Sequence, residues 1–233
     1  MFEIRMEHPA KNALGSELVG WLGERLDEAE DRPILLTGTG DAFSAGLNLK
    51  EVATLGPGEM PNFLQGMDRL CERLFHHPAP TVACVNGHAI AGGCVLVQCC
   101  DHRVATANPR TKIGLNEVAI GVCFPTRILK LLQFRLPVRH LARVLLGAAL
   151  FAPEEALRLG LVDEIEEDPE PLARRRLEEL AAHPPVAYAR TKATLHAGVT
   201  EVSREDERRF HEEELPIWTS DEVKQRVLAV LAR

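Results

Sequence analysis

Three segments decide the fold of this chain: FSAGLNLKEV at residues 43–52, VNGHAIAGGC at 85–94 and CDHRVATANPRTKIGLNEVAIG at 100–121. The first two follow short apolar runs at 34–37 and 81–85, which are typical of strands buried on both faces. Each of these two segments then leads through glycines into an expected helix. This order of strand, glycine-rich loop and helix predicts an α/β core with a parallel sheet.

Around these segments the spacing of apolar residues predicts helices. We expect one helix at 16–30, capped by Ser16, and another at 60–75. Pro153 and Gly160 enclose a further helix, because proline is common at the start of a helix and glycine just after its end. From Pro169 onward every segment favours helix. We therefore expect residues 1–168 to form the core with the active site and residues 169–233 to form a helical C-terminal region.

The composition excludes several classes of protein. The 233 residues are 45% apolar and 26% charged, as in ordinary globular domains. A formal net charge of −7 argues against a nucleic-acid partner, because phosphate backbones are bound by clustered lysines and arginines. No apolar stretch is long enough to span a bilayer, and the N-terminus lacks a secretory signal. We therefore expect a cytoplasmic location and no membrane partner.

The sequence around the cysteines predicts that they pack in the core and take no part in metal binding or catalysis. None of them forms a CxxC pair, and most lie in apolar surroundings, which is typical of reduced cysteines in a core. The spacing of these cysteines does not suit a zinc site and no HExxH motif is present, so no metal site is expected. The six are Cys71, Cys84, Cys94, Cys99, Cys100 and Cys123.

The two glycine-rich loops can offer backbone N–H groups to a ligand. The loop at 38–46 matches neither a dinucleotide fingerprint nor a P-loop, and it resembles a nucleophile elbow only superficially. Donors near Gly46 and Leu47, together with Gly92 at a helix start, can form an oxyanion hole. Glu117 lies among apolar residues, where burial would raise its pKa and suit it to proton transfer. On this local pattern alone, a solvated loop glutamate or a structural ion pair is the commoner explanation of the same residue.

Taken together and in this order, the three segments resemble the crotonase superfamily of enoyl-CoA hydratases and isomerases. EEALRLGLVDEI at 154–165 resembles the next motif of that family. The resemblance implies a crotonase-like spiral of ββα units with a C-terminal helical region that supports a homotrimer or hexamer. It also implies an acyl-CoA thioester as substrate and no separate cofactor, because CoA is part of the substrate.

Carried over by position, the resemblance assigns catalytic roles to Glu117 and to the N–H groups of Leu47 and Gly92. Family members usually carry Asp where this chain has Asn48. Hydratases of the family carry a second glutamate three residues after the second oxyanion glycine, where this chain has Val95. The predicted substrate-binding residues are Ala45, Gly46, Asn48, Lys50, Gly93, Val95 and Phe124. Lys50 is included because its charge can pair with a CoA phosphate, although a solvated lysine at a helix end is the commoner explanation.

The single glutamate favours an isomerase. One base can remove a proton from C2 of a 3-enoyl-CoA and return it at C4, whereas adding water is easier with two acid/base groups. The motif AGGC, an aliphatic residue and then IGLNE is similar to Δ3-Δ2-enoyl-CoA isomerases. Two alternatives remain open. One is a hydratase or thioester hydrolase that recruits His88 or Asn116, and the other is a non-catalytic acyl-CoA-binding subunit.

Overall fold

Eight parallel strands form two sheets in a computed structural model that describes residues 1–232. The larger sheet has the order β1-β2-β4-β6-β8 and the smaller one the order β3-β5-β7. The strands of the larger sheet are β1 (Phe2–Met6), β2 (Ile34–Gly38), β4 (Thr81–Val85), β6 (His102–Thr106) and β8 (Glu164–Glu166). Those of the smaller sheet are β3 (Ala42–Ser44), β5 (His88–Ile90) and β7 (Ile113–Gly114).

The strands follow one another as a spiral. Each of β2, β4 and β6 runs on into a strand of the small sheet and then into helix. The helices that follow are α3 (Leu49–Thr54) with α4 (Met60–Phe75), α5 (Gly92–Cys99) and α6 (Glu117–Ile120). The spiral of ββα units is therefore confirmed. Residues 42–44 and 88–90, expected to be loop, instead pair as β3 and β5, since strands of three residues are too short to show a periodic pattern.

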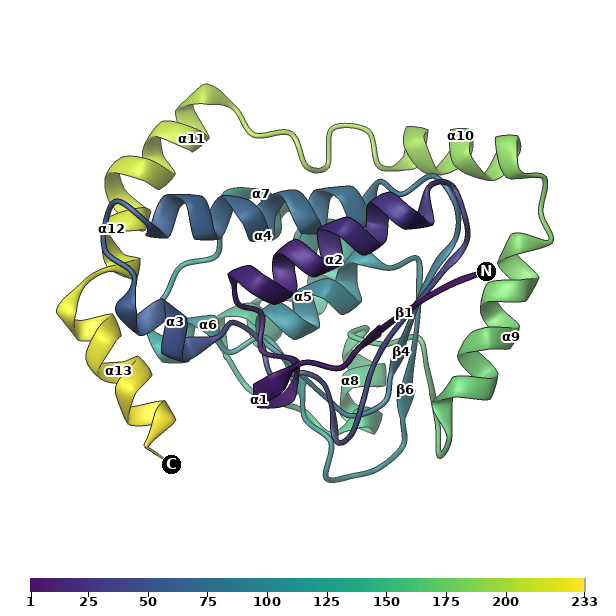
Figure 1. Cartoon of the computed structure of the whole chain (residues 1–233), viewed down its shortest axis with the longest axis horizontal. Helices are drawn as coiled ribbons and strands as arrows, with labels where there is room; N and C mark the ends of the chain where they lie inside the picture. Colours follow the sequence, from purple (N-terminus) through teal and green to yellow (C-terminus); the bar gives the residue numbers. More distant parts are fainter. Residues whose placement is uncertain (233) are drawn as a thin grey trace.

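Both faces of the larger sheet are covered, which explains its continuous apolar strands. Leu36 packs in the core on the side of α2 (Ser16–Ala29), α4 and α5, while Leu35 packs against Leu172 and Leu177 of α9 (Pro169–Ala181). The order of these layers is visible in Figure 1. Because helices hold the sheet from both sides, the glycine-rich loops that follow β2 and β4 start from fixed positions.

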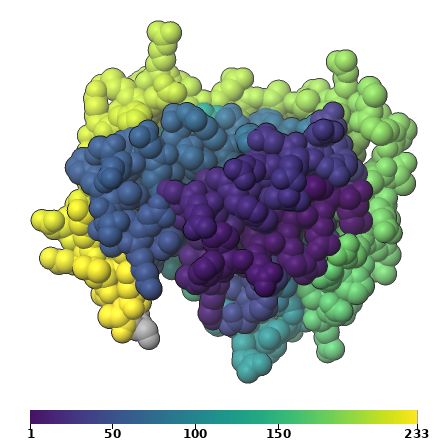
Figure 2. All heavy atoms as spheres, viewed as in Figure 1, coloured from purple at the N-terminus to yellow at the C-terminus, as the bar shows by residue number. Residues whose placement is uncertain are grey.

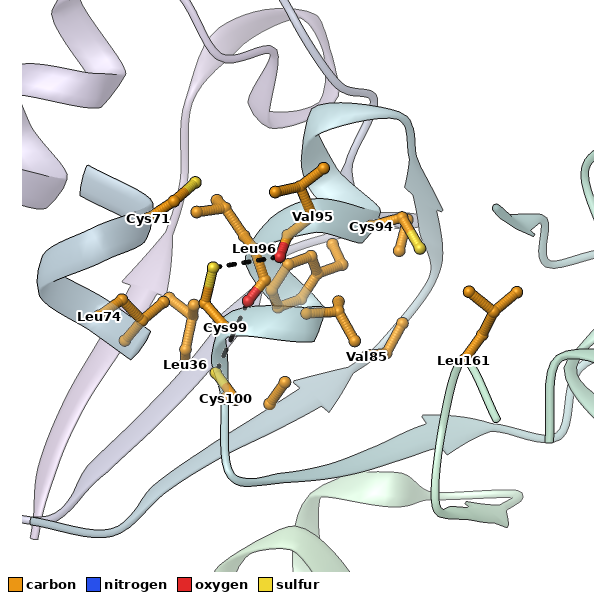
Figure 3. Packing of buried hydrophobic residues seen from close by; sticks show 14 of the residues in the cluster. Leu36, Cys71, Leu74, Val85, Cys94, Val95, Leu96, Cys99, Cys100 and Leu161 are labelled. Atoms are coloured by element: carbon orange, nitrogen blue, oxygen red, sulfur yellow. Dashed lines mark hydrogen bonds between the residues drawn. The ribbon is translucent and has the colours of Figure 1, made fainter. Parts of the chain in front are cut away.

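The cysteines pack in this core, as the sequence predicts. Five of the six are buried, and none forms a disulfide. Figure 3 shows Cys99 and Cys100 at the end of α5, where their thiols donate to the carbonyls of Val95 and Leu96 at 3.2 and 3.8 Å. Burial raises the pKa of the Cys94 thiol to about 12, so it stays protonated. Among residues 1–232 no cluster of three metal-ligating side chains occurs.

The C-terminal third is helical, and it wraps around the core. It runs from α9 along the upper edge of the view in Figure 1 to α13, which lies beside α3. Figure 2 shows it flanking the N-terminal part on both sides. In the described part of the chain no helix is long and apolar enough to cross a membrane. The remaining α-helices are α1 (Pro9–Asn12), α7 (Thr126–Arg135), α8 (Pro153–Leu159), α10 (Pro185–Leu195), α11 (Arg204–Arg209), α12 (Leu215–Trp218) and α13 (Asp221–Leu231).

One predicted helix cap is wrong and another is confirmed. Ser16 is the first residue of α2 rather than its cap, and both its N–H and its hydroxyl donate to the carboxylate of Glu51 in α3. A carboxylate from a neighbouring helix therefore replaces the expected serine cap, since it satisfies the free N–H at the start of the helix. Gly160 follows α8 with the left-handed φ of 81° that the sequence predicts there.

Candidate active site

A cavity of about 300 Å³ lies where the glycine loops meet α4, α6 and the C-terminal helices. Among residues 1–232 its wall is apolar apart from the side chains of Asn116, Glu117 and Trp218. Of the ten site residues implied by the sequence, six line it. They are Ala45, Leu47, Gly92, Val95, Glu117 and Phe124.

The backbone leaves the N–H of Leu47 free. Leu14 and Leu47 form an isolated parallel bridge, in which Leu14 donates to the carbonyl of Gly46 at 2.7 Å and Asn48 donates to that of Leu14 at 3.0 Å. The hydrogen bonds of this bridge therefore use the carbonyl of Gly46 and the N–H of Asn48. The N–H of Leu47 itself points away from Leu14. No backbone acceptor within residues 1–232 receives it.

The N–H of Gly92 is free for a different reason. Gly92 is the first residue of α5, so its N–H has no acceptor inside the helix. A Cβ built on Gly92 would lie 3.6 Å from the backbone nitrogen of Leu47. The backbones of Gly92 and Leu47 are therefore close neighbours in the cavity wall. Two free donors this close are suited to hold an oxyanion.

Ala91 turns the chain into this helix with an unusual backbone. Its φ of 48° and ψ of −120° belong to a region that L-residues rarely adopt. Two hydrogen bonds hold it, from its own N–H to Gly114 at 2.8 Å and from Val95 to its carbonyl at 2.9 Å. Strain is thus stored directly before the N–H of Gly92.

Gly46 and Gly93 hold the two loops together rather than line the cavity. A Cβ on Gly46 would lie 2.6 Å from the carbonyl oxygen of Ile90, and one on Gly93 would lie 2.5 Å from that of Ser44. Either contact is shorter than side chains allow. Both positions therefore need glycine for the close approach of two backbones.

Two predicted substrate-binding residues lie outside the cavity. Asn48 caps α3, since its Oδ1 accepts from the N–H groups of Lys50 at 3.2 Å and Glu51 at 3.4 Å. Lys50 is exposed on the same helix, and neither residue lines the cavity. The side chain of Asn48 serves the helix because asparagine is a favoured cap.

Glu117 is the one ionisable side chain on the cavity wall among residues 1–232. It is 8% exposed, and its Oε2 is buried without a hydrogen-bond partner. Burial raises its pKa to about 8. The alternatives of a solvated glutamate or a structural ion pair are therefore wrong. A buried carboxyl that titrates near neutral pH can take up a proton and give it back.

Several wall residues were not predicted from the sequence. Trp218, Val227 and Val230 close the cavity from α12 and α13, about a hundred residues along the chain from Glu117. The indole Nε1 of Trp218 is buried without a partner, as is Oδ1 of Asn116. Nothing local in the sequence signals these long-range contacts.

His88, one of the two groups that a hydratase could recruit, does not line the cavity. Its Nδ1 accepts from the N–H of Lys112 at 3.0 Å. Asn116, the other group, does line it.

Comparisons with known proteins agree with this arrangement. A family model described as enoyl-CoA hydratase/isomerase matches residues 1–225. The human mitochondrial enoyl-CoA delta isomerase 1 is 32% identical over 199 residues, which cover 82% of this chain and 66% of that protein, just under two thirds of its length. A short-chain-enoyl-CoA hydratase of Clostridium acetobutylicum is 29% identical over 197 residues, covering 82% of this chain and 75% of the hydratase.

The crystal structure of human mitochondrial delta3-delta2-enoyl-CoA isomerase superposes with a TM-score of 0.92. The sequence identity is 28%, and the match covers 99% of this chain and 92% of the isomerase chain. The superposition confirms the crotonase-like α/β fold with C-terminal helices.

Proposed function

Because the chain belongs to the enoyl-CoA hydratase/isomerase family, we propose that it is an isomerase that converts a 3-enoyl-CoA into a 2-enoyl-CoA with Glu117 as sole proton shuttle. Support comes from Glu117 being the one ionisable side chain that lines the cavity within residues 1–232. Support also comes from the relatives named as isomerases.

The thioester oxygen would accept hydrogen bonds from the N–H groups of Leu47 and Gly92. These donors are held by backbone packing, so they need no rearrangement as charge develops on the oxygen. The acyl chain would lie along the apolar wall, with C2 and C4 facing Glu117. CoA itself would extend out of the cavity, and no separate cofactor takes part.

The proposed reaction moves one proton and two electron pairs. The carboxylate of Glu117 takes a proton from C2, and the electron pair of that C–H bond spreads through the C3–C4 double bond and the thioester as a dienolate. The protonated carboxyl then gives the proton to C4, which leaves the double bond between C2 and C3. Atoms and charge balance within substrate and enzyme, and the stabilised dienolate lowers the barrier.

Val95 makes the difference between isomerisation and hydration. It lines the cavity at 3% exposure in the position where the hydratases of this family carry a second glutamate. A valine side chain there has no acid/base group with which to activate water. One carboxylate without a second acid/base partner suits proton transfer between two carbons of the same substrate.

A hydratase or thioester hydrolase is the second candidate, because Asn116 lines the cavity beside Glu117. Its buried Oδ1 has no partner in the described structure and could accept a hydrogen bond from a water molecule. In that mechanism Glu117 would activate the same water. A non-catalytic acyl-CoA-binding subunit would use the same cavity without any turnover.

Product identification separates these functions. The protein is incubated with 3-enoyl-CoA and with 2-enoyl-CoA substrates, and the products are identified by mass spectrometry and by absorbance of the conjugated thioester. We expect a shifted double bond without added mass. A 3-hydroxyacyl-CoA, free CoA or unchanged substrate would instead support the hydratase, the hydrolase or the binding subunit.

We also propose that the helical region from Pro169 onward supports assembly into a homotrimer or hexamer. Val186 and Leu195 on α10 are 72% and 62% exposed, as expected for apolar side chains that a second copy covers. Sedimentation of the purified protein tests this directly. A cytoplasmic location stays a prediction, since the human relative is named as mitochondrial.

A further inference from the structure

An open apolar groove of about 440 Å³ lies on the outer side of the wall that carries Glu117. Leu129 of α7 and Leu145 contribute to it, together with the exposed side chains of Val118 and Leu146. Gln133, Arg209 and Glu214 line it as well. The lining of the groove is therefore mostly apolar and partly polar. The groove and the cavity lie on opposite sides of the wall formed by residues 117–124.

The wall between cavity and groove is one residue thick. Along residues 117–129 neighbouring side chains face opposite ways: Glu117 and Val122 line the cavity, whereas Val118 and Cys123 line the groove. The single residue of 1–232 that lines both spaces is Phe124, which is 9% exposed. Phe124 therefore lies between the cavity and the groove.

We propose that Phe124 sets the upper limit of acyl-chain length by closing the cavity off from this groove. The inference rests on the proposed acyl-CoA substrate. With C2 to C4 placed against Glu117, later carbons that run along residues 117–124 would meet Phe124, which lines the same cavity. The cavity of about 300 Å³ is at the small end of ligand sites, and a longer chain reaches the ring. Beyond Phe124 most of the residues that line the groove are apolar, which suits a saturated hydrocarbon.

Binding of saturated acyl-CoAs tests the proposal without using the isomerase reaction. Dissociation constants are measured by calorimetry for even-numbered chains from four to sixteen carbons. Each methylene that enters the cavity should improve affinity about four-fold. In the wild type we expect this gain to stop at a limiting length. In Phe124→Ala the gain should continue for several more carbons.

Three further variants make the result specific. Met67→Ala enlarges the cavity from α4 without bordering the groove, so the limiting length should stay within one methylene of the wild type. Ala142→Trp, placed in the Phe124→Ala background, fills the groove and should restore the wild-type limit. Phe124→Leu keeps more of the buried volume and should shift the limit by a smaller amount if the alanine variant fails to fold.

Two outcomes overturn the proposal. One is an unchanged limit in folded Phe124→Ala and Phe124→Leu proteins. The other is a limiting acyl-chain length that increases in Trp218→Leu and not in the Phe124 variants, because the acyl chain would then end against α12. If no saturated acyl-CoA binds the wild type at all, the proposed function fails as well. If acyl-CoAs bind but the limiting chain length is the same in the Phe124 variants, only the role of Phe124 fails.

Discussion

The two sides of the cavity are built in opposite ways. On the side of the sheet the proposed functional groups are the backbone N–H donors of Leu47 and Gly92, held by loops that touch at Gly46 and Gly93. On the other side they are side chains, with Glu117 among apolar residues of α6, α7 and the C-terminal helices. The backbone side should therefore tolerate no added atom at the contact glycines. The side-chain side should depend on one carboxyl and tolerate changes in volume elsewhere.

Glu117→Gln should have the largest effect, since it removes the proposed proton shuttle and keeps the shape of the side chain. We expect kcat for 3-enoyl-CoA to fall at least about 10³-fold. Binding of a saturated acyl-CoA should stay within about three-fold of the wild type, because a neutral amide resembles the protonated carboxyl. A variant that retains turnover would remove Glu117 from the mechanism.

Gly93→Ala should have the next largest effect, on the backbone side. Its Cβ would lie 2.5 Å from the carbonyl oxygen of Ser44, so the start of α5 and the N–H of Gly92 must move. We expect kcat to fall about 10²-fold, the cost of losing one oxyanion donor. Gly20→Ala in α2 is the matched control, because a Cβ there meets no atom within 4 Å. It should leave kcat unchanged. Equal activity of the two variants would contradict the rigid packing of the loops.

The raised pKa of Glu117 predicts how activity depends on pH. The reaction starts from the carboxylate, so kcat/KM should rise about ten-fold per pH unit and level off near pH 8. A profile that is already flat above pH 5 would show that the carboxyl titrates in its ordinary range.

The same pKa predicts a pH-dependent stability. The folded protein holds the proton between pH 4.5 and 8 whereas the unfolded chain does not, so the free energy of unfolding falls as pH rises through this window. Relative to Glu117→Gln, the wild type should lose roughly 3–5 kcal/mol by pH 8. Urea unfolding of both proteins at several pH values measures the difference. Parallel curves would contradict it.

Ala91→Gly should have the smallest effect. It tests whether the backbone side of the cavity is strained at Ala91. Glycine adopts the φ of 48° at Ala91 without strain, so the variant should be more stable by about 1 kcal/mol. Activity should change less than about three-fold, since the N–H of Gly92 keeps its place. A loss of stability would mean that the backbone at Ala91 is not strained.

The contrast also explains what the sequence could predict. The buried strands, the glycine loops and Glu117 carry local signals: apolar runs, glycine before a helix, and one carboxylate among apolar residues. The fold and the meeting of the two glycine loops at the cavity could therefore be predicted. Ala91 carries no such signal, because alanine normally avoids a positive φ.

Other features depend on contacts between distant parts of the chain. The cavity wall from Trp218 and Val227 forms only when α12 packs against α4 and α13 packs against α3 and α6. Asn48 was expected at the substrate because of the family pattern, but its amide caps α3. The partition by Phe124 likewise depends on which way neighbouring side chains face, and composition does not determine this.

Transfer of a labelled proton tests the central claim most directly. A 3-enoyl-CoA carrying deuterium at both C2 positions is converted in ordinary water, and the product is analysed for deuterium at C4. Because Glu117 is buried among apolar residues, it should return part of the deuterium it removes before exchange with solvent. The account predicts 2-enoyl-CoA with deuterium at C4, formed by the wild type and not by Glu117→Gln. A 3-hydroxyacyl-CoA product, or a labelled product still formed by the glutamine variant, would contradict it.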